Sequence, residues 1–171
     1  MKTLESYIRE IPDFPKKGIL FKDITPLLQD AFAFRKAVDA MVALIPHQKL
    51  DCIVCIEARG FVFGGALADR LEVGVIPVRK KGRLPYRSRC VSYSLEYGQA
   101  SLEIHEDALK AGQRVLILDD LLATGGTAKA AAELVESFGA TVAGFLFLIE
   151  LTFLKGKERL KGYPVSSLIQ Y

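Results

Sequence analysis

One stretch of the chain, residues 115–127, carries many of the residue types that could do chemistry. It begins with four apolar residues, two of them leucine and two β-branched, which predicts a buried strand of a parallel sheet. Two adjacent carboxylates, Asp119 and Asp120, follow directly. Carboxylates at the end of a strand can accept hydrogen bonds from ribose hydroxyls or hold a hard cation. The residues alone leave both roles open.

A loop with two glycines follows the carboxylates and leads into an alanine-rich stretch, residues 128–138, that we expect to be helical. Glycines let a backbone turn tightly and direct several N–H groups toward one place. That place is a helix N-terminus, where unpaired donors and the helix dipole favour an anion. The sequence therefore predicts a phosphate-binding loop. Its residues are Ala123, Thr124, Gly125, Gly126 and Thr127.

Two other interpretations of the stretch are disfavoured. A strand that ends in Asp and holds magnesium also occurs in P-loop nucleotide hydrolases, but these need the motif G-x-x-x-x-G-K-[ST] elsewhere. The chain contains neither that motif nor G-x-G-x-x-G. An ordinary connection is a poor explanation as well, because two carboxylates at the end of a buried strand are costly to keep.

Length and composition set the broad class. The chain has 171 residues, which predicts a single domain over residues 1–171, and 50% of them are hydrophobic, enough for a substantial core. The net charge of +3 is weak, so we expect no nucleic-acid partner, which would need a clustered basic face. The longest apolar runs are too short to span a bilayer, and the polar start does not resemble a signal peptide. We therefore expect a cytoplasmic protein with no membrane partner.

The cysteines and histidines predict no metal site. Cys52 and Cys55 have the C-x-x-C spacing that could indicate zinc or redox chemistry. Both lie in an apolar run typical of a strand, where residues three apart point to opposite faces. We therefore expect buried core thiols. His47 and His105 have no metal-ligand spacing around them.

Strand-like and helix-like segments alternate, which predicts an α/β fold with a central, mainly parallel sheet flanked by helices. Ligands of open α/β sheets bind beyond the carboxyl ends of the strands. Loops at residues 57–60, 79–89 and 119–127 occupy such ends. We expect helices at residues 3–11, 30–45, 61–71, 128–138 and 153–160. We expect parallel strands at residues 52–56, 74–79, 113–120, 141–149 and 165–169, and an antiparallel hairpin between residues 90 and 104.

The stretch 119–127 is similar to the phosphoribosyl-pyrophosphate (PRPP) motif of the type I phosphoribosyltransferases. With Leu121-Leu122-Ala123 after the acidic pair, the chain resembles the adenine phosphoribosyltransferases in particular. The resemblance covers almost the whole chain and includes residues 11–15, 18–24, 57–61, 78–85, 92–98 and 102–104. It implies the type I phosphoribosyltransferase fold, with a small N-terminal hood from about residues 1–30 that binds the base.

The resemblance also implies roles for the residues of the three loops. Residues 123–127 would hold the 5′-phosphate of PRPP, and Asp119 and Asp120 would bind the ribose hydroxyls or lie near the water shell of a metal ion. The peptide bond between Glu57 and Ala58 is expected to be cis. The candidate pyrophosphate ligands are Arg59, Arg79, Lys80 and Arg83, and it stays open whether a neighbouring subunit uses some of them.

The base-binding residues that the resemblance implies come from two segments. Leu20, Phe21 and either Leu121 or Leu122 would enclose the purine. Backbone groups of Leu20 and Lys22 would read its Watson–Crick edge. The family often has arginine where this chain has Lys22, so a role of that side chain is open.

The reaction that the resemblance implies joins adenine to PRPP and gives AMP and pyrophosphate, with magnesium bound mainly through PRPP. Pyrophosphate leaves C1′ of the ribose while positive charge develops on the sugar and a nitrogen of adenine attacks. Glu96 would handle the proton of the purine ring as a general acid and base, and Tyr97 would cover the site. The family also implies a homodimer.

Two other functions stay open. One is a phosphoribosyltransferase for hypoxanthine, guanine or xanthine, which the segments around Phe21 and Glu96 disfavour. The other is a PRPP-binding regulator without catalysis. Such a regulator needs a nucleic-acid surface, whereas this chain has little net charge and no segment typical of a winged or helix-turn-helix motif.

Overall fold

The structure is a computed structural model that describes residues 2–45, 48–94 and 99–171. The chain forms two compact units, Met1–Ala40 and Met41–Tyr171. The first unit begins with a 3-10 turn, η1 (Glu5–Tyr7), and an antiparallel hairpin of β1 (Arg9–Pro12) and β2 (Leu20–Asp23). It continues with α1 (Thr25–Gln29) and with most of α2 (Ala31–Ala43).

The first unit corrects one prediction, because residues 3–11 do not form a helix. Helical hydrogen bonds are limited to the turn of η1, and β1 begins at Arg9. In β1, Ile11 pairs with Phe21 of β2, and the ring of Phe21 packs edge-on against Phe14 with 5.1 Å between centroids. A helix of nine residues has little stability of its own, so pairing across the hairpin overrides the apolar spacing that suggested it.

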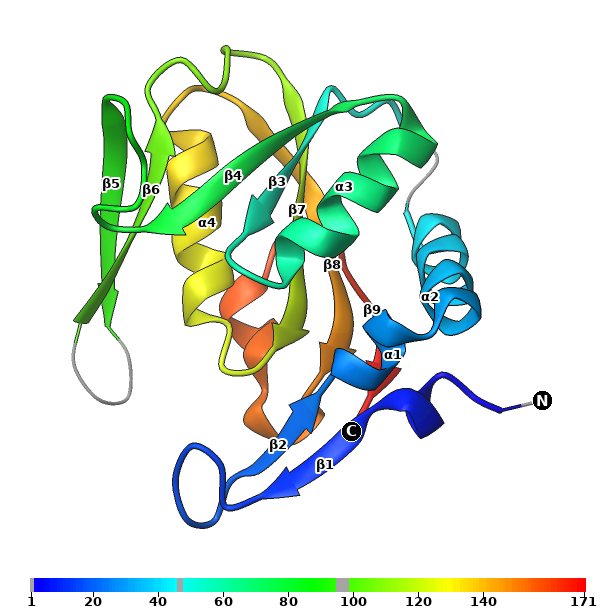
Figure 1. Cartoon of the computed structure of the whole chain (residues 1–171). Helices are drawn as coiled ribbons and strands as arrows, with labels where there is room; N and C mark the ends of the chain where they lie inside the picture. The colour runs from blue at the N-terminus through cyan, green and yellow to red at the C-terminus, as the bar shows by residue number, and fades with distance from the viewer. Residues whose placement is uncertain (1, 46–47, 95–98) are drawn as a thin grey trace. The chain divides into compact units, whose positions relative to one another are not determined.

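The second unit is built on a seven-stranded sheet in the order β5-β6-β4-β3-β7-β8-β9 (Figure 1). β5 (Ser88–Ser94) and β6 (Gln99–His105) are antiparallel, and β6 is antiparallel to β4. The remaining neighbours pair in parallel, which confirms the predicted α/β fold with a mainly parallel sheet. These parallel strands are β3 (Cys52–Ile56), β4 (Gly74–Lys80), β7 (Arg114–Leu122), β8 (Thr141–Glu150) and β9 (Val165–Gln170).

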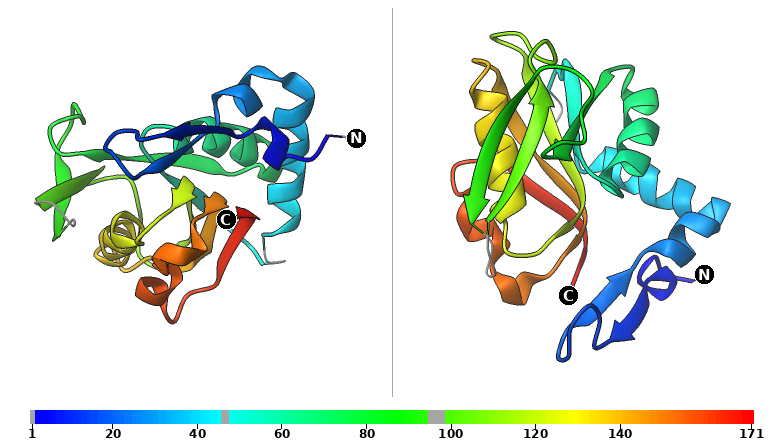
Figure 2. Two further views of the ribbon diagram at one scale, coloured as in Figure 1. Left: turned by 90° about the horizontal axis from the view of Figure 1, so that it is seen from below. Right: turned by 60° about the vertical axis from the view of Figure 1, so that its left-hand side comes forward.

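Two helices cover opposite faces of this sheet, as Figure 2 shows. α3 (Gly60–Leu71) follows β3, and α4 (Gly126–Glu136) follows β7. The crossovers from β3 to β4 and from β7 to β8 therefore leave two adjacent strands in opposite directions. Such a switch point opens a crevice at the carboxyl ends of the two strands. Among the described helices, none combines the length and the apolar character that crossing a membrane requires.

The interior of β3 confirms the prediction for the two cysteines. Cys52 and Cys55 are both buried and free of disulfides. Burial raises the pKa of the Cys52 thiol to about 11 and that of Cys55 to about 12. Both thiols are therefore protonated at neutral pH and poor nucleophiles.

Gly64 of α3 tests how closely the helix packs on the sheet, because a methyl group there would overlap the sulfur of Cys55. We expect Gly64→Ala to lower the free energy of unfolding by roughly 2 kcal/mol, since overpacking forces the core to shift. Gly65 is the matched control, because a methyl group there meets no described atom within 4 Å. Gly65→Ala should be neutral or slightly stabilising. Urea unfolding measures both variants, and equal stabilities would contradict the close packing.

Candidate active site

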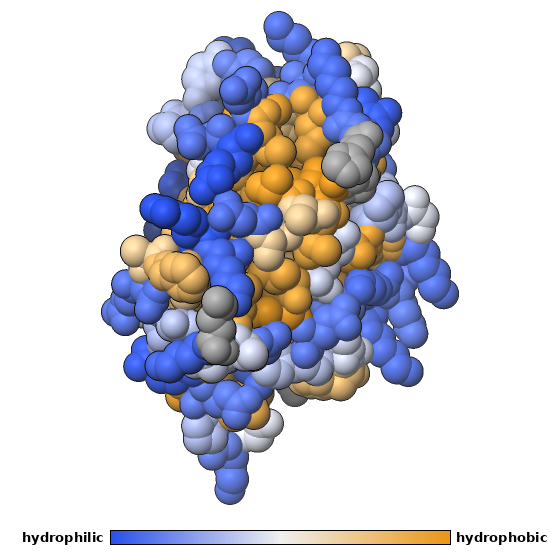
Figure 3. Space-filling model, turned by 90° about the vertical axis from the view of Figure 1, so that its right-hand side faces the viewer, coloured by the Kyte–Doolittle hydropathy of each residue, from blue (hydrophilic) through white to orange (hydrophobic). Residues whose placement is uncertain are grey.

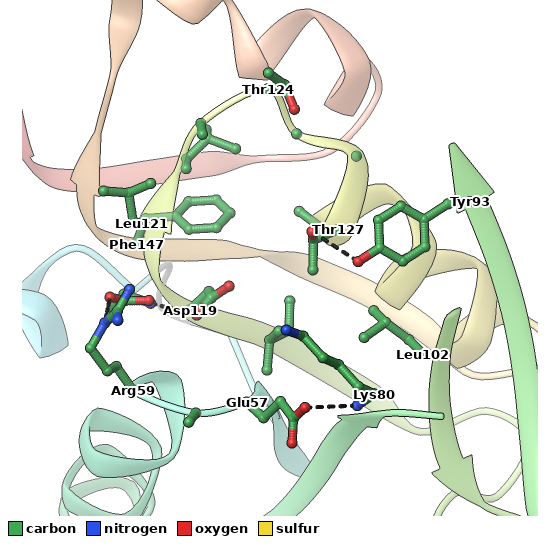
Figure 4. A pocket seen from close by; sticks show the side chains of 18 residues that line it. Glu57, Arg59, Lys80, Tyr93, Leu102, Asp119, Leu121, Thr124, Thr127 and Phe147 are labelled. Carbon is green, nitrogen blue, oxygen red and sulfur yellow. Dashed lines mark hydrogen bonds and ion pairs between the residues drawn. The ribbon is translucent and has the colours of Figure 1, made fainter. Parts of the chain in front are cut away.

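The loops after β3 and β7 line one cavity of about 470 Å³ (Figure 4). Its position agrees with the switch point between these two strands. Side chains from β5, β6 and β8 close its other sides. The lining residues are 56–59, 80, 93, 102, 119–128 and 147.

The cavity brings together most of the site residues that the sequence analysis predicted within the second unit. Arg79 and Arg83 are not among the described residues that line it. Glu96 and Tyr97 lie outside the described residues. The predicted residues that do line it are Arg59, Lys80, Asp119, Asp120, Leu121, Leu122, Ala123, Thr124, Gly125, Gly126 and Thr127.

The two carboxylates lie at the end of β7, and each accepts a defined hydrogen bond. Asp119 Oδ1 accepts one from the backbone N–H of Asp120 at 2.8 Å. Asp120 is buried, and its Oδ2 accepts one from Arg59 Nε at 2.5 Å. Desolvation, together with the charge of Asp120, raises the pKa of Asp119 well above its ordinary value. Keeping both groups ionised at neutral pH therefore costs folding free energy.

The phosphate loop has the backbone conformation that its glycines predict. Gly125 adopts φ +81°, in the left-handed region that glycine enters without strain, and it is the N-cap residue of α4. It offers no side chain to cap the helix, and the first turn holds no acidic residue. An anion at this end of α4 would satisfy N–H groups that a capping side chain satisfies in other helices.

Glu57 organises the basic loop that follows β4. Its Oε2 accepts a hydrogen bond from Arg79 Nε at 2.9 Å, and its Oε1 accepts one from the backbone N–H of Lys80 at 3.1 Å. Burial favours a higher pKa for Glu57, but the hydrogen bonds from Arg79 and Lys80 outweigh it and lower the pKa. The peptide bond between Glu57 and Ala58 is cis, as the resemblance implies. Lys80 thus lines the cavity while the Arg79 guanidinium is held by Glu57.

Glu57 and Tyr93 line the cavity, although the sequence analysis assigned neither a role in ligand binding. The contact of Glu57 with Arg79 depends on the register of β3 against β4, in which Ile56 pairs with Val78, so no local sequence signal could have found it. The Tyr93 hydroxyl lies 3.2 Å from Thr127 Oγ1, and either oxygen can donate (Figure 4). Alternation along β5 predicted the hairpin, but no local pattern states which helix faces Tyr93.

The three predicted base-binding residues of the first unit lie on β2. Leu20 is exposed, and Phe21 is half-buried. Lys22 is buried, and its Nζ pairs with the carboxylate of Glu10 on β1. The side chain of Lys22 is therefore engaged within the hairpin itself.

The donor set at the cavity fits magnesium only in combination with a substrate. Among the residues that the structure describes, no group of three or more His, Cys, Asp and Glu side chains could hold a metal ion. Magnesium bound to substrate phosphates usually takes one or two protein carboxylates and keeps several waters. Asp119 and Asp120 supply such carboxylates at the cavity.

The chain is similar to known proteins over almost its whole length. A family model described as phosphoribosyl transferase domain matches residues 28–167. The adenine phosphoribosyltransferase of Nitrosococcus oceani is 57% identical over 171 residues, which is 100% of each chain. The crystal structure of the adenine phosphoribosyltransferase from Thermoanaerobacter pseudethanolicus has a TM-score of 0.96 and 56% identity, over 99% of this chain and 100% of that one. The Saccharomyces cerevisiae enzyme, crystallised with an imino-altritol bisphosphate and adenine, has a TM-score of 0.91 and 43% identity, with 96% of each chain covered.

The chain therefore belongs to the phosphoribosyltransferase family and, within it, to the adenine phosphoribosyltransferases. The family and the fold that the sequence resemblance implied are thereby confirmed. The domain match contains all three loops predicted at the ends of parallel strands, and the relatives extend over the N-terminal hairpin as well.

Asp119 offers a test of the electrostatic cost of the site. We expect Asp119→Asn to raise the free energy of unfolding at pH 7 by about 1 kcal/mol, because it removes a half-buried charge beside the buried Asp120. The amide oxygen can still accept the hydrogen bond from the Asp120 N–H. Between the ordinary pKa of 3.8 and the raised folded value, the folded protein holds a proton that the unfolded chain has released. Stability of the wild type therefore falls as pH rises through this window.

The Asp119→Asn variant should lose this part of the pH dependence. Urea unfolding of both proteins between pH 4 and 8 measures the difference. A variant that is less stable than the wild type at pH 7 would contradict the cost assigned to Asp119.

Proposed function

We propose that this chain transfers the 5-phosphoribosyl group of PRPP to adenine, in purine salvage, and releases AMP and pyrophosphate. The observation that carries the proposal is one cavity that contains both the acidic pair of β7 and the glycine loop at the start of α4. The full-length similarity to adenine phosphoribosyltransferases supports it, as does the adenine in the crystals of the Saccharomyces cerevisiae enzyme.

The glycine loop would bind the 5′-phosphate. Its backbone N–H groups and the dipole of α4 favour a dianion at this position. Thr124 and Thr127 add hydroxyl donors. A phosphate fixed here anchors one end of PRPP, so that the sugar can be held in a single orientation.

Asp119 and Asp120 would accept hydrogen bonds from the ribose hydroxyls. Such bonds give the two carboxylates donors that compensate for the water lost on burial. They also fix the ribose ring, which keeps C1′ in position for the incoming base. The cost of the acidic pair in the ligand-free protein is thus offset when PRPP binds.

The cationic side chains at the cavity would stabilise the departing pyrophosphate. Arg59 and Lys80 line the cavity, and negative charge grows on the leaving group as its bond to C1′ breaks. Charges placed there are worth more in the transition state than in the ground state. Arg79 and Arg83 stay candidates for the same role, in this subunit or in a neighbouring one.

The base-binding and proton-transfer roles rest on the family resemblance. Glu96 would accept the proton that the adenine nitrogen loses as its bond to C1′ forms, and Tyr97 would cover the site. The residues that we propose for the base are Leu20, Phe21, Lys22, Leu121 and Leu122.

We also propose magnesium, bound mainly through PRPP, with Asp119 and Asp120 near its water shell. The ion would neutralise charge on the pyrophosphate. This proposal agrees with the small number of carboxylates at the cavity.

A homodimer stays a prediction from the family, and a cytoplasmic location stays a prediction from the sequence pattern. Apolar side chains gather over part of the surface that Figure 3 shows. Among the exposed apolar side chains of the second unit, Val62 of α3 is 45% exposed and Val75 of β4 is 41% exposed. A second copy of the chain that covered these side chains would remove their apolar area from water.

The reaction is tested by measuring pyrophosphate release from PRPP and magnesium with adenine, hypoxanthine, guanine or xanthine. We expect release with adenine alone, because the proposed base site is the one implied for that family. Release with an oxopurine instead would keep the PRPP site but contradict the base-binding assignment. Binding of PRPP without release in the presence of any base would favour a regulator over an enzyme.

A further inference from the structure

Gly156 lies directly against the phosphate loop, although it is about thirty residues further along the chain. It is the first residue of the 3-10 helix η3 (Gly156–Leu160), and it is buried. A methyl group on Gly156 would overlap the carbonyl oxygen of Ala123 and would lie 3.0 Å from the Leu122 side chain. A methyl group on Gly125 would in turn overlap the carbonyl oxygen of Gly156. Two backbone segments therefore touch here with no side chain between them.

This contact lies at the part of the phosphate loop whose backbone N–H groups would point toward a bound phosphate. Gly125 has the left-handed conformation that starts α4, and η3 packs against α4 as well. The directions of the loop N–H groups depend on the backbone angles near Gly125. The backbone around Gly156 forms a wall beside the loop. Because this wall fits the loop closely, it restricts the backbone angles near Gly125 before any phosphate binds.

The wall is itself tied to the sheet through Glu150 at the end of β8. Glu150 is 4% exposed, and its Oε2 lies 2.7 Å from Nζ of Lys157, the residue after Gly156. The same carboxylate accepts hydrogen bonds from Ser167 Oγ and from Gln170 Nε2 of β9. The position of Gly156 therefore depends on a carboxylate that β9 and Lys157 hold from two sides.

We propose that Gly156 is a positioning residue for the 5′-phosphate of PRPP, and that the Glu150–Lys157 ion pair sets its place. The proposal rests on the proposed function, which gives the loop its ligand. Gly156 acts through Ala123 and Gly125. A shift of this wall should weaken binding at the phosphate loop. It should spare pyrophosphate binding, because Arg59 and Lys80, the candidate pyrophosphate ligands that line the cavity, lie after β3 and at the end of β4.

Gly156→Ala tests the contact, with Gly74→Ala as the matched control because a methyl group at Gly74 meets no described atom within 4 Å. Calorimetry measures the Kd of ribose 5-phosphate and, separately, the Kd of magnesium pyrophosphate. We expect Gly156→Ala to weaken ribose 5-phosphate binding about tenfold, since the added methyl must displace the loop. The Kd of pyrophosphate should change by less than about twofold, because its site is separate. In turnover, the KM for PRPP should rise more than kcat falls.

Unchanged ribose 5-phosphate binding, or an equal loss for both ligands, would overturn the positioning role. Because Gly156→Ala can fail to fold, Glu150→Gln provides a second test that keeps the side-chain shape but removes the charge facing Lys157. We expect a selective loss of about threefold for ribose 5-phosphate. Glu158→Gln, at an exposed carboxylate of the same 3-10 helix, should leave both Kd values unchanged. A uniform loss or no loss in Glu150→Gln would overturn the proposal.

The wild-type protein separates this inference from the proposed function. A wild type that turns over adenine and PRPP, with variants that show no selective loss, would overturn only the role of Gly156. A wild type that binds neither ribose 5-phosphate nor pyrophosphate would overturn the proposed function, and the positioning role with it.

Discussion

The mutual repulsion and desolvation of two adjacent carboxylates at the end of β7 is the constraint on which the site depends. Asp119 lies beside Asp120, and desolvation together with the charge of Asp120 raises the pKa of Asp119. Arg59, at the start of α3, compensates part of the charge by pairing with Asp120. Stability alone would favour a less costly pair of residues. In the proposed function, hydroxyl donors of a bound sugar would give the carboxylates the partners that the ligand-free protein supplies only in part.

The topology of the sheet explains why this pair meets cationic groups and backbone donors. β3 and β7 are neighbours whose crossovers leave toward opposite faces, so their end loops border one crevice. The loop after β3 brings Arg59 and Glu57, and Glu57 in turn anchors the start of the basic loop after β4. Alanines on the buried side of α4 allow that helix to lie close to the sheet. Its first residue, Gly126, comes only a few residues after the acidic pair in the sequence.

Much of the second unit could be predicted from the sequence, because short apolar runs and glycine-rich loops have few alternative structures. The run at residues 115–118 and the loop after it formed a strand and a helix start as their composition predicts. The contact of Gly156 with the phosphate loop could not be predicted, since it joins segments about thirty residues apart without a repeating pattern. The helix expected at residues 3–11 was wrong because strand pairing with β2, a non-local interaction, outweighed a short apolar spacing.

The site residues differ in how far the sequence could assign them. Adjacent carboxylates before a glycine loop mark a site, so the place of Asp119 and Asp120 at one cavity could be predicted, whereas their types alone left a ribose role and a cation role open. Basic residues carry less information, because a guanidinium can bind a ligand or another side chain. Arg79, held by Glu57, shows the second case, whereas Lys80 beside it lines the cavity. Only the register of β3 against β4 determines that Arg79 pairs with Glu57 and that Lys80 lines the cavity.

In the proposed function, Asp119 and Asp120 bind the ribose hydroxyls of PRPP. The most direct test is a calorimetric titration of magnesium PRPP into the wild type and into a double variant with Asp119→Asn and Asp120→Asn. We expect the affinity of the double variant to fall about a hundredfold, because two hydrogen bonds to charged groups are lost. The variant should still unfold in one cooperative transition. An affinity for PRPP equal to that of the wild type would contradict the claim.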